Sequence, residues 1–171
     1  MRECNLNCRW GEIEGMTRVF VIGASLPRLQ GSSRIIAASY RTEQLVEPIL
    51  AAGHEVRLCA ASYFSTHGRR RYVRRMRDGL LDYYEMNFLM ADQRDQLESL
   101  CDEYSPDCVI AVSPQAGMLA AGIVGDLPLW CDLYGAIMAE AQAKAYVYND
   151  NDFLSGFWAS ERVLLERGDV F

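Results

Sequence analysis

The sequence contains no apolar run long enough to cross a membrane as a helix. About 20 consecutive apolar residues are needed for a spanning helix, and no run in this chain of 171 residues approaches that length. The first residues also lack a basic stretch followed by an apolar one, so they do not resemble a secretory signal. We therefore expect a cytoplasmic protein whose thiols are reduced.

The two common glycine-rich nucleotide motifs are missing as well. A loop with glycines follows the first expected strand, but its spacing is not the G-x-G-x-x-G of a dinucleotide fingerprint. No Gly-Lys-Ser or Gly-Lys-Thr follows it, so it is not a P-loop. We therefore expect no cofactor.

The six cysteines do not form the pattern of a disulfide framework or of a zinc site. Cys4 and Cys8 make a single C-x3-C pair, and no second Cys or His pair stands at zinc spacing. The other four fall in expected buried strands or on an expected helix, where a free cysteine packs as a small apolar residue: Cys59, Cys101, Cys108 and Cys131. We therefore expect no metal.

Positive charge is scarce and is carried almost entirely by arginine. Lys144 is the only lysine, and the net charge of −6 argues against a general nucleic-acid-binding protein. Six arginines cluster between Arg69 and Arg77. On a helix, Arg70, Arg74 and Arg77 would share one face and could contact phosphate or the anionic lipids of a membrane surface. The alternative, which we favour, is a solvated loop whose charges pair with the acidic remainder.

Alternating strand and helix patterns predict a single α/β domain. Half of the residues are apolar, and the length fits one domain. We expect strands at 18–24, 54–61, 80–88 and 107–112, with another in the apolar run that Pro128 and Gly135 bound. Helices are expected at 34–52, 91–104, 116–124, 136–145 and 149–167. This alternation predicts a three-layer, Rossmann-like parallel sheet with helices on both faces.

The ends of the chain lead to two expectations about the domain boundaries. Residues 1–15 are polar and without pattern, so we expect an upstream extension that is poorly ordered. The domain then spans residues 16–171. Residues 169–171 resemble the start of another strand, so we expect the domain to be incomplete at its carboxyl end.

The loop between the first strand and the first helix is a candidate ligand site. A glycine-containing loop at this place presents backbone N–H groups at the positive end of a helix, which suits a phosphate, a carboxylate or sugar hydroxyls. The candidate binding residues in this loop are Gly23, Ser25, Gly31, Ser32 and Ser33.

Polar residues also follow two later strands, and parallel strands carry their ligand-contacting groups at their carboxyl ends. Ser113 follows one strand, and Asp132 ends the next, with Tyr134 and Gly135 just beyond it. Asp132 either contacts a ligand or caps the helix that follows. We expect Glu140, on that helix, to have a structural role and to bond backbone near Ser113.

Three segments carry a resemblance to a known family. They are residues 18–23 with their Gly-Ser-Ser loop, residues 106–114, and the block Asp-Leu-x-Gly-x-x-Met-Ala-Glu-Ala-Gln at 132–142. Together they resemble the amino-terminal domain of GT-B glycosyltransferases, in particular bacterial retaining enzymes of the glycogen-synthase-like, or group 1, type. The resemblance covers residues 16–171, and the block at 132–142 is its specific part.

The resemblance implies the acceptor-side domain of a hexosyltransferase that uses a nucleotide-sugar donor. In this family the carboxyl-terminal domain grips the donor, so we expect the present chain to be a fragment without activity of its own. Its partners would be that missing domain, the nucleotide-sugar and an unknown acceptor. Asp132 would be the catalytic group, accepting a bond from a sugar hydroxyl or stabilising positive charge at the anomeric carbon. The alternative is a non-catalytic, flavodoxin-like binding or regulatory module.

Overall fold

The structure of the chain is a computed structural model, which describes residues 15–29, 37–61, 72–87, 90–133, 137–149 and 151–170. Apart from Gly15, the expected amino-terminal extension lies outside the described residues.

The expected alternation of strands and helices is confirmed. The strands are β1 (Arg18–Gly23), β2 (Glu55–Ala61), β3 (Tyr72–Asp78), β4 (Leu81–Asn87), β5 (Cys108–Val112) and β6 (Leu129–Asp132). The helices are the short 3-10 turn η1 (Pro27–Leu29), α1 (Ala37–Ala51), α2 (Met90–Tyr104), α3 (Pro114–Ala121), α4 (Ile137–Tyr148) and α5 (Asn151–Arg167). A helix follows β1, β4, β5 and β6 along the chain, whereas β2 is followed by the strand β3.

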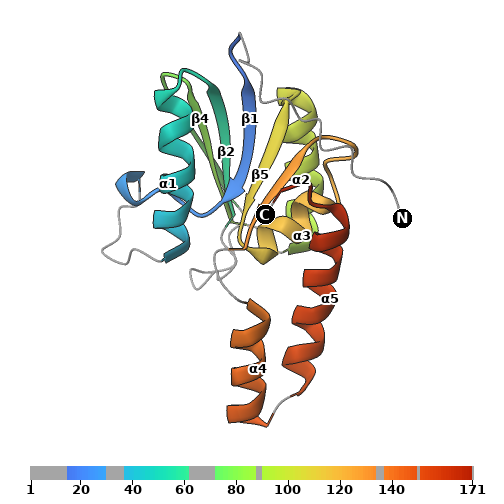
Figure 1. The fold of residues 1–171 in the computed structure, drawn as a ribbon. Coiled ribbons are helices and arrows are strands. Elements are labelled where there is room, and N and C mark those ends of the chain that lie inside the picture. The colour runs from blue at the N-terminus through green and yellow to red at the C-terminus, as the bar shows by residue number, and fades with distance from the viewer. Residues whose placement is uncertain are drawn as a thin grey trace.

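The strands form one mostly parallel sheet in the order β3-β4-β2-β1-β5-β6 (Figure 1). Without β3, which pairs antiparallel with β4 at the edge, the order is that of the Rossmann fold. The alternative interpretation named a flavodoxin-like module, and the flavodoxin fold has a different strand order. Beyond β6, Val170 makes one parallel bridge to Trp130, where the sequence predicted the start of another strand.

Helices cover both faces of the sheet, which accounts for its apolar strands. Side chains alternate along β1: Val19 and Val21 pack on one face, and Phe20 and Ile22 on the other. Val46 of α1 joins the first group. Residues of α2, α3 and α5 join the second, and Figure 1 shows these three helices opposite α1. The expected three-layer, Rossmann-like fold is confirmed.

The arginine-rich segment is a strand, so the expectations of a helix or a loop are both wrong for residues 72–78. β3 and β4 form a hairpin in which Asp78 pairs with Leu81, leaving Gly79 and Leu80 as the turn. Gly79 has a φ of +55°, a backbone conformation that two-residue hairpin turns need and glycine adopts easily. Arg69, Arg70 and Arg71 lie outside the described residues.

Helices α4 and α5 pack against each other beyond the carboxyl ends of the strands (Figure 1). Among the α4 side chains that the structure describes, Ala141 and Ala145 are the buried ones; they lie one turn apart, and α5 is the main packing partner of this helix. The last turn of α4 is exposed and apolar, with Tyr146, Val147 and Tyr148 open to solvent. α5 also packs against α3, which ties this helix pair to the rest of the domain.

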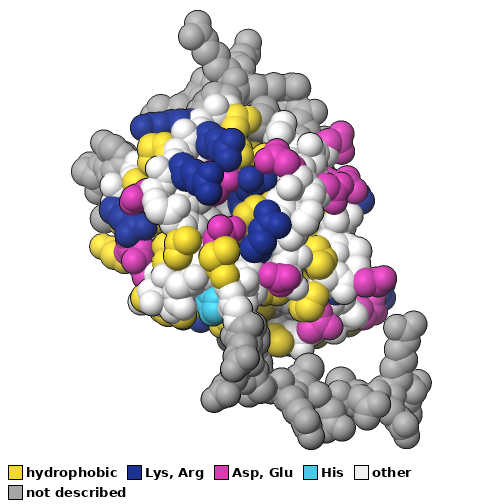
Figure 2. All heavy atoms as spheres, turned by 90° about the horizontal axis from the view of Figure 1, so that it is seen from above, with side chains coloured by type: hydrophobic (Ala, Val, Ile, Leu, Met, Phe, Trp, Pro, Cys, Tyr) yellow, Lys and Arg dark blue, Asp and Glu magenta, His cyan; other side chains and the backbone are white. Residues whose placement is uncertain are grey.

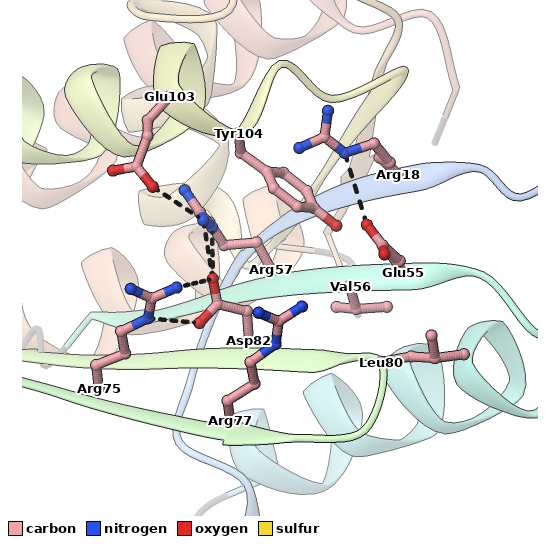
Figure 3. A pocket seen from close by; sticks show the side chains of 10 residues that line it. All are labelled: Arg18, Glu55, Val56, Arg57, Arg75, Arg77, Leu80, Asp82, Glu103 and Tyr104. Carbon is pink, nitrogen blue, oxygen red and sulfur yellow. Dashed lines mark hydrogen bonds and ion pairs between the residues drawn. The ribbon is translucent and has the colours of Figure 1, made fainter.

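A charged network is buried on the α2 face of the sheet (Figure 3). Arg57 of β2 is 6% exposed, and its Nη2 lies 2.8 Å from Oδ2 of Asp82 in β4. Asp82 also accepts two bonds from Arg75, at 2.8 and 3.0 Å. The Arg57 guanidinium donates to the carbonyl of Leu100 and stacks 4.6 Å from the ring centroid of Tyr104. These contacts compensate the cost of burying the charges.

We expect Asp82→Ala to lower the free energy of unfolding by about 3–5 kcal/mol, because Arg57 would lose its main counterion while remaining buried. Urea unfolding would measure the change. Asp78→Ala is the matched control: it removes the same charge from an exposed position nearby and is expected to change stability by about 0.5 kcal/mol at most. Equal effects of the two variants would contradict the importance of the network.

Candidate functional site

The carboxyl ends of three neighbouring strands bring together Gly23, Ser113 and Asp132. β1 and β5 are adjacent, and β5 pairs with β6 so that Val112 lies opposite Asp132. The N–H of Ser113 donates to the carbonyl of Asp132 at 3.0 Å. The chain leaves β1 and β5 toward opposite faces of the sheet, and open α/β sheets bind ligands beside such a point.

Asp132 forms a bidentate ion pair with Arg41. The sequence predicted either a ligand contact or a helix cap for Asp132, and neither included this pair. Oδ2 accepts from Nε at 2.6 Å, and Oδ1 accepts from Nη2 at 3.0 Å. Asp132 is 6% exposed, whereas the Arg41 side chain is 39% exposed. The hydrogen bonds and charge of the carboxylate raise the pKa of the Arg41 guanidinium, so the guanidinium keeps its charge. The ion pair joins the end of β6 to the second turn of α1.

This pair still has hydrogen-bonding capacity for a ligand. Each carboxylate oxygen has a second lone pair, so Asp132 can accept from a sugar hydroxyl while it remains bound to Arg41. The pair uses Nε and Nη2 of Arg41, so the N–H groups of Nη1 are not used in it, and the Arg41 side chain as a whole is 39% exposed. The edge therefore combines acceptors for hydroxyls with a positive group for phosphate.

Ser113 has a strained backbone. Its φ of 108° and ψ of 156° lie in a region that is almost restricted to glycine. The side chain caps α3, accepting from the N–H of Ala116 at 3.2 Å, and Pro114 begins the helix. Strain of this kind is concentrated at functional sites, where the surrounding structure imposes it. Ser113 is buried, and its hydroxyl proton remains available for donation.

We expect opposite effects from two substitutions at Ser113. Ser113→Ala keeps the strained φ and loses the cap, so the free energy of unfolding should fall by about 1 kcal/mol. Ser113→Gly relieves about 1–3 kcal/mol of strain. Glycine is a slightly weaker cap than serine, which lowers the free energy of unfolding by only a few tenths of a kcal/mol. The greater entropy of glycine in the unfolded chain lowers it by about 0.5–1 kcal/mol.

The glycine variant should therefore be as stable as the parent protein or more stable. Chemical denaturation of both variants would measure this difference. If the glycine variant were destabilised as much as the alanine variant, the strain would not be real.

Gly23 is required by the close approach of α1 to the end of β1. A Cβ at this position would lie 2.8 Å from Oγ1 and 2.9 Å from Cγ2 of Thr42. Thr42 cannot easily move away, because its hydroxyl accepts from the N–H of Ala24 at 3.0 Å and donates to the carbonyl of Ala38 at 2.8 Å. The absence of a side chain at Gly23 thus has a structural reason independent of any ligand.

Gly23→Ala is expected to lower the free energy of unfolding by about 1–3 kcal/mol, the usual cost of overpacking. Thr42→Ala removes both clashing atoms. The double variant should therefore be more stable than the sum of the single changes predicts, by about 1 kcal/mol. A thermodynamic cycle from urea unfolding measures this coupling, and strict additivity would show that the contact is relieved in another way.

The remaining expected site residues are only partly covered by the structure. Ser25 is partly buried two residues beyond β1. Five candidates lie outside the described residues: Gly31, Ser32, Ser33, Tyr134 and Gly135. Residues 134–136, which lead into α4, are among those outside, so capping of that helix by Asp132 stays a prediction.

The expectation that Glu140 bonds backbone near Ser113 is wrong, whereas its structural role stays a prediction. Its side chain is exposed and pairs with Lys144 one turn along α4, with 2.5 Å between the charged atoms. The N–H of Ser113, near which Glu140 was expected to bond, donates instead to the Asp132 carbonyl.

The thiols of the described part of the chain are not arranged for metal binding, and burial raises the pKa values of the cysteines there. Within the described ranges, no group of three or more His, Cys, Asp or Glu side chains could hold a metal ion. Burial raises the pKa of Cys101 and of Cys131 to about 11 and that of Cys59 still further, so these groups stay protonated. Cys4 and Cys8 lie outside the described residues.

Sequence reasoning missed Arg41, although one signal for such a partner was present. A carboxylate expected at the end of a buried strand needs a counterion. The first turns of α1 lie beside the same edge, because α1 follows β1. Arg41 is the residue there that bears a positive charge.

Comparison with protein-family models finds no match to this sequence, and comparison with curated proteins finds none either. In the part of the chain that the structure covers, no helix has the length and apolar character to cross a membrane.

Proposed function

We propose that this chain is the acceptor-side domain of a nucleotide-sugar-dependent glycosyltransferase of the retaining GT-B type. The observation that carries the proposal is the Asp132–Arg41 pair at the carboxyl edge of a Rossmann-like sheet. Asp132 is also the first residue of the Asp-Leu-x-Gly-x-x-Met-Ala-Glu-Ala-Gln block. The sequence block that carries the resemblance thus begins at the same residue, Asp132, that stands at the carboxyl edge of the sheet.

In the proposed reaction, the bond from the anomeric carbon of the donor sugar to its phosphate breaks. A bond to an acceptor oxygen forms, and the proton of that acceptor hydroxyl passes to the departing phosphate oxygen of the nucleoside diphosphate. Asp132 accepts a hydrogen bond from a sugar hydroxyl and stabilises positive charge at the anomeric carbon. The Arg41 guanidinium holds this carboxylate in place and presents Nη1 toward anionic groups.

The nucleotide-sugar is held mainly by a second domain, and transfer takes place between the two. This division follows from the family resemblance, with the loop at residues 23–33, Ser113, Tyr134 and Gly135 on the acceptor side. A cytoplasmic location is part of the proposal. It is supported by the free thiols of Cys59, Cys101, Cys108 and Cys131, since disulfides are rare in that compartment.

Asp132→Asn tests the proposal in a protein that carries this domain together with a donor domain. Loss of one electrostatic group should lower turnover by roughly a hundredfold or more. Release of nucleoside diphosphate from a panel of nucleotide-sugars, with and without acceptor, measures turnover. Loss of the pair with Arg41 should also lower the free energy of unfolding by about 1–2 kcal/mol, so the assay is run well below the melting temperature.

Asp126→Asn is the matched control, because it makes the same chemical change at an exposed aspartate. Its turnover should equal that of the parent protein. If Asp132→Asn were as active as this control, the pair would be purely structural and the proposed role of Asp132 would be wrong. Absence of donor cleavage in the parent protein across the whole panel would count against the transferase itself.

A further inference from the structure

A hollow of about 280 Å³ opens at the opposite, amino-terminal edge of the sheet. Its walls are the first residues of β1, β2 and β4, the last residues of β3, and the end of α2 (Figure 3). Four arginines line it, together with three acids and Tyr104. Figure 2 looks onto this end of the molecule and shows basic side chains gathered there, with acidic ones between and beside them.

The strand register places Arg77, Asp82 and Arg57 in one row across the sheet. Asp82 is shared by Arg57 and Arg75, and Glu103 pairs with Arg57 at 3.2 Å. Arg77 lies directly opposite Asp82 in the ladder, yet it makes no ion pair or hydrogen bond with any described residue. The third acid, Glu55, pairs with Arg18 at 3.7 Å. The acids of the hollow are thus occupied by the other arginines, and the Arg77 guanidinium remains.

Tyr104 supplies a second unused donor at the hollow. The residue is 5% exposed, and its hydroxyl makes no hydrogen bond of standard length and angle with a described residue. The nearby Arg18 guanidinium can only donate to this oxygen, so the hydroxyl proton stays unused. Burial raises the pKa of this hydroxyl to about 12, so it keeps its proton. A buried hydroxyl proton without an acceptor is costly and uncommon, which indicates a group that a ligand satisfies.

We propose that this hollow binds a phosphate group, with Arg77 and the Tyr104 hydroxyl as donors to its oxygens. Both unused groups are donors, so the ligand must supply acceptors. The charges that line the hollow sum to +1, from four arginines and three acids, so an anion is favoured. Guanidinium groups pair well with phosphate oxygens. The volume, just under that of ordinary ligand sites, suits inorganic phosphate or a small phosphate ester.

The phosphate could belong to a soluble molecule or to a phospholipid headgroup, since both present the same oxygens. This site lies at the edge of the sheet away from Asp132 and does not depend on the proposed transferase activity.

Titration calorimetry with inorganic phosphate at low ionic strength tests the site. The chain should show saturable binding, and Arg77→Ala should weaken it about tenfold or more, the scale of a bond to a charged group. Tyr104→Phe removes only the hydroxyl and should weaken binding about threefold to tenfold. Its melting temperature should change little, because the hydroxyl makes no hydrogen bond of standard geometry with a described residue in the free protein.

Arg74→Ala is the matched control. Arg74 is on the same strand with the same charge, but the alternation of side chains places it on the other face of the sheet. Its effect should be less than about twofold, because only long-range charge is lost. If Arg74→Ala weakened phosphate binding as much as Arg77→Ala, the proposal would be overturned. It would also be overturned if the protein bound neither inorganic phosphate nor the phospholipid vesicles described next.

The second probe is a phosphatidylcholine vesicle containing phosphatidic acid, used in cosedimentation. Binding to inorganic phosphate without binding to vesicles identifies a soluble ligand. Binding to vesicles that Arg77→Ala abolishes and that Arg74→Ala leaves intact identifies a headgroup. Both results support the site. If Arg77→Ala and Arg74→Ala weakened vesicle binding equally, the binding would reflect only general attraction between charges, and the site would be contradicted.

Discussion

The parallel pairing of β1 with both of its neighbours is the constraint on which the rest of the structure depends. Parallel strands cannot be joined by tight turns, so the chain must cross over the sheet between them. Helices then cover both faces, and every second residue of β1 enters a different core. The same constraint collects the carboxyl ends of the parallel strands at one edge. The parallel topology therefore accounts for the position of Asp132 at this edge, whatever its chemical role.

Two arginine–aspartate pairs secure opposite ends of this sheet. Arg57 and Asp82 are both buried and belong to neighbouring strands, whereas Arg41 is partly exposed and connects a helix to Asp132. In each pair the aspartate accepts from a planar, forked guanidinium, a geometry that the single ammonium group of lysine cannot reproduce. The Arg57 guanidinium stacks against the rings of two tyrosines, and its pair with Asp82 also lines the hollow at the amino-terminal edge. The two pairs differ in the exposure of the arginine side chain, which is 7% for Arg57 and 39% for Arg41.

Sequence patterns were sufficient where burial determines the structure. Apolar runs identified β1, β2 and β5, and Ser113-Pro114 identified the start of α3. They failed at β3, where arginines occupy both faces of an edge strand and no apolar alternation exists. The Asp78-Gly79 pair was a turn signal that the charge cluster obscured.

The partner of Asp132 was beyond sequence reasoning for a different reason. Arg41 is 91 residues away along the chain, and only the crossover of α1 brings the two together. The strain at Ser113 was equally unpredictable, because backbone dihedrals at the end of β5 depend on how α3 packs. The burial of Arg57 follows from Asp82 and Tyr104, which lie on two other elements.

The attachment of α4 to the domain has a consequence for local opening. Its main packing partner is α5, and its contact surface contains the small residues Ala141 and Ala145. Few apolar contacts oppose its separation, so it can detach while the sheet keeps its hydrogen bonds. Amide protons of α4 should then exchange with solvent through subglobal opening, and those of β1 through global unfolding. This difference in exchange would make α4 a cooperative unit of its own within a single domain.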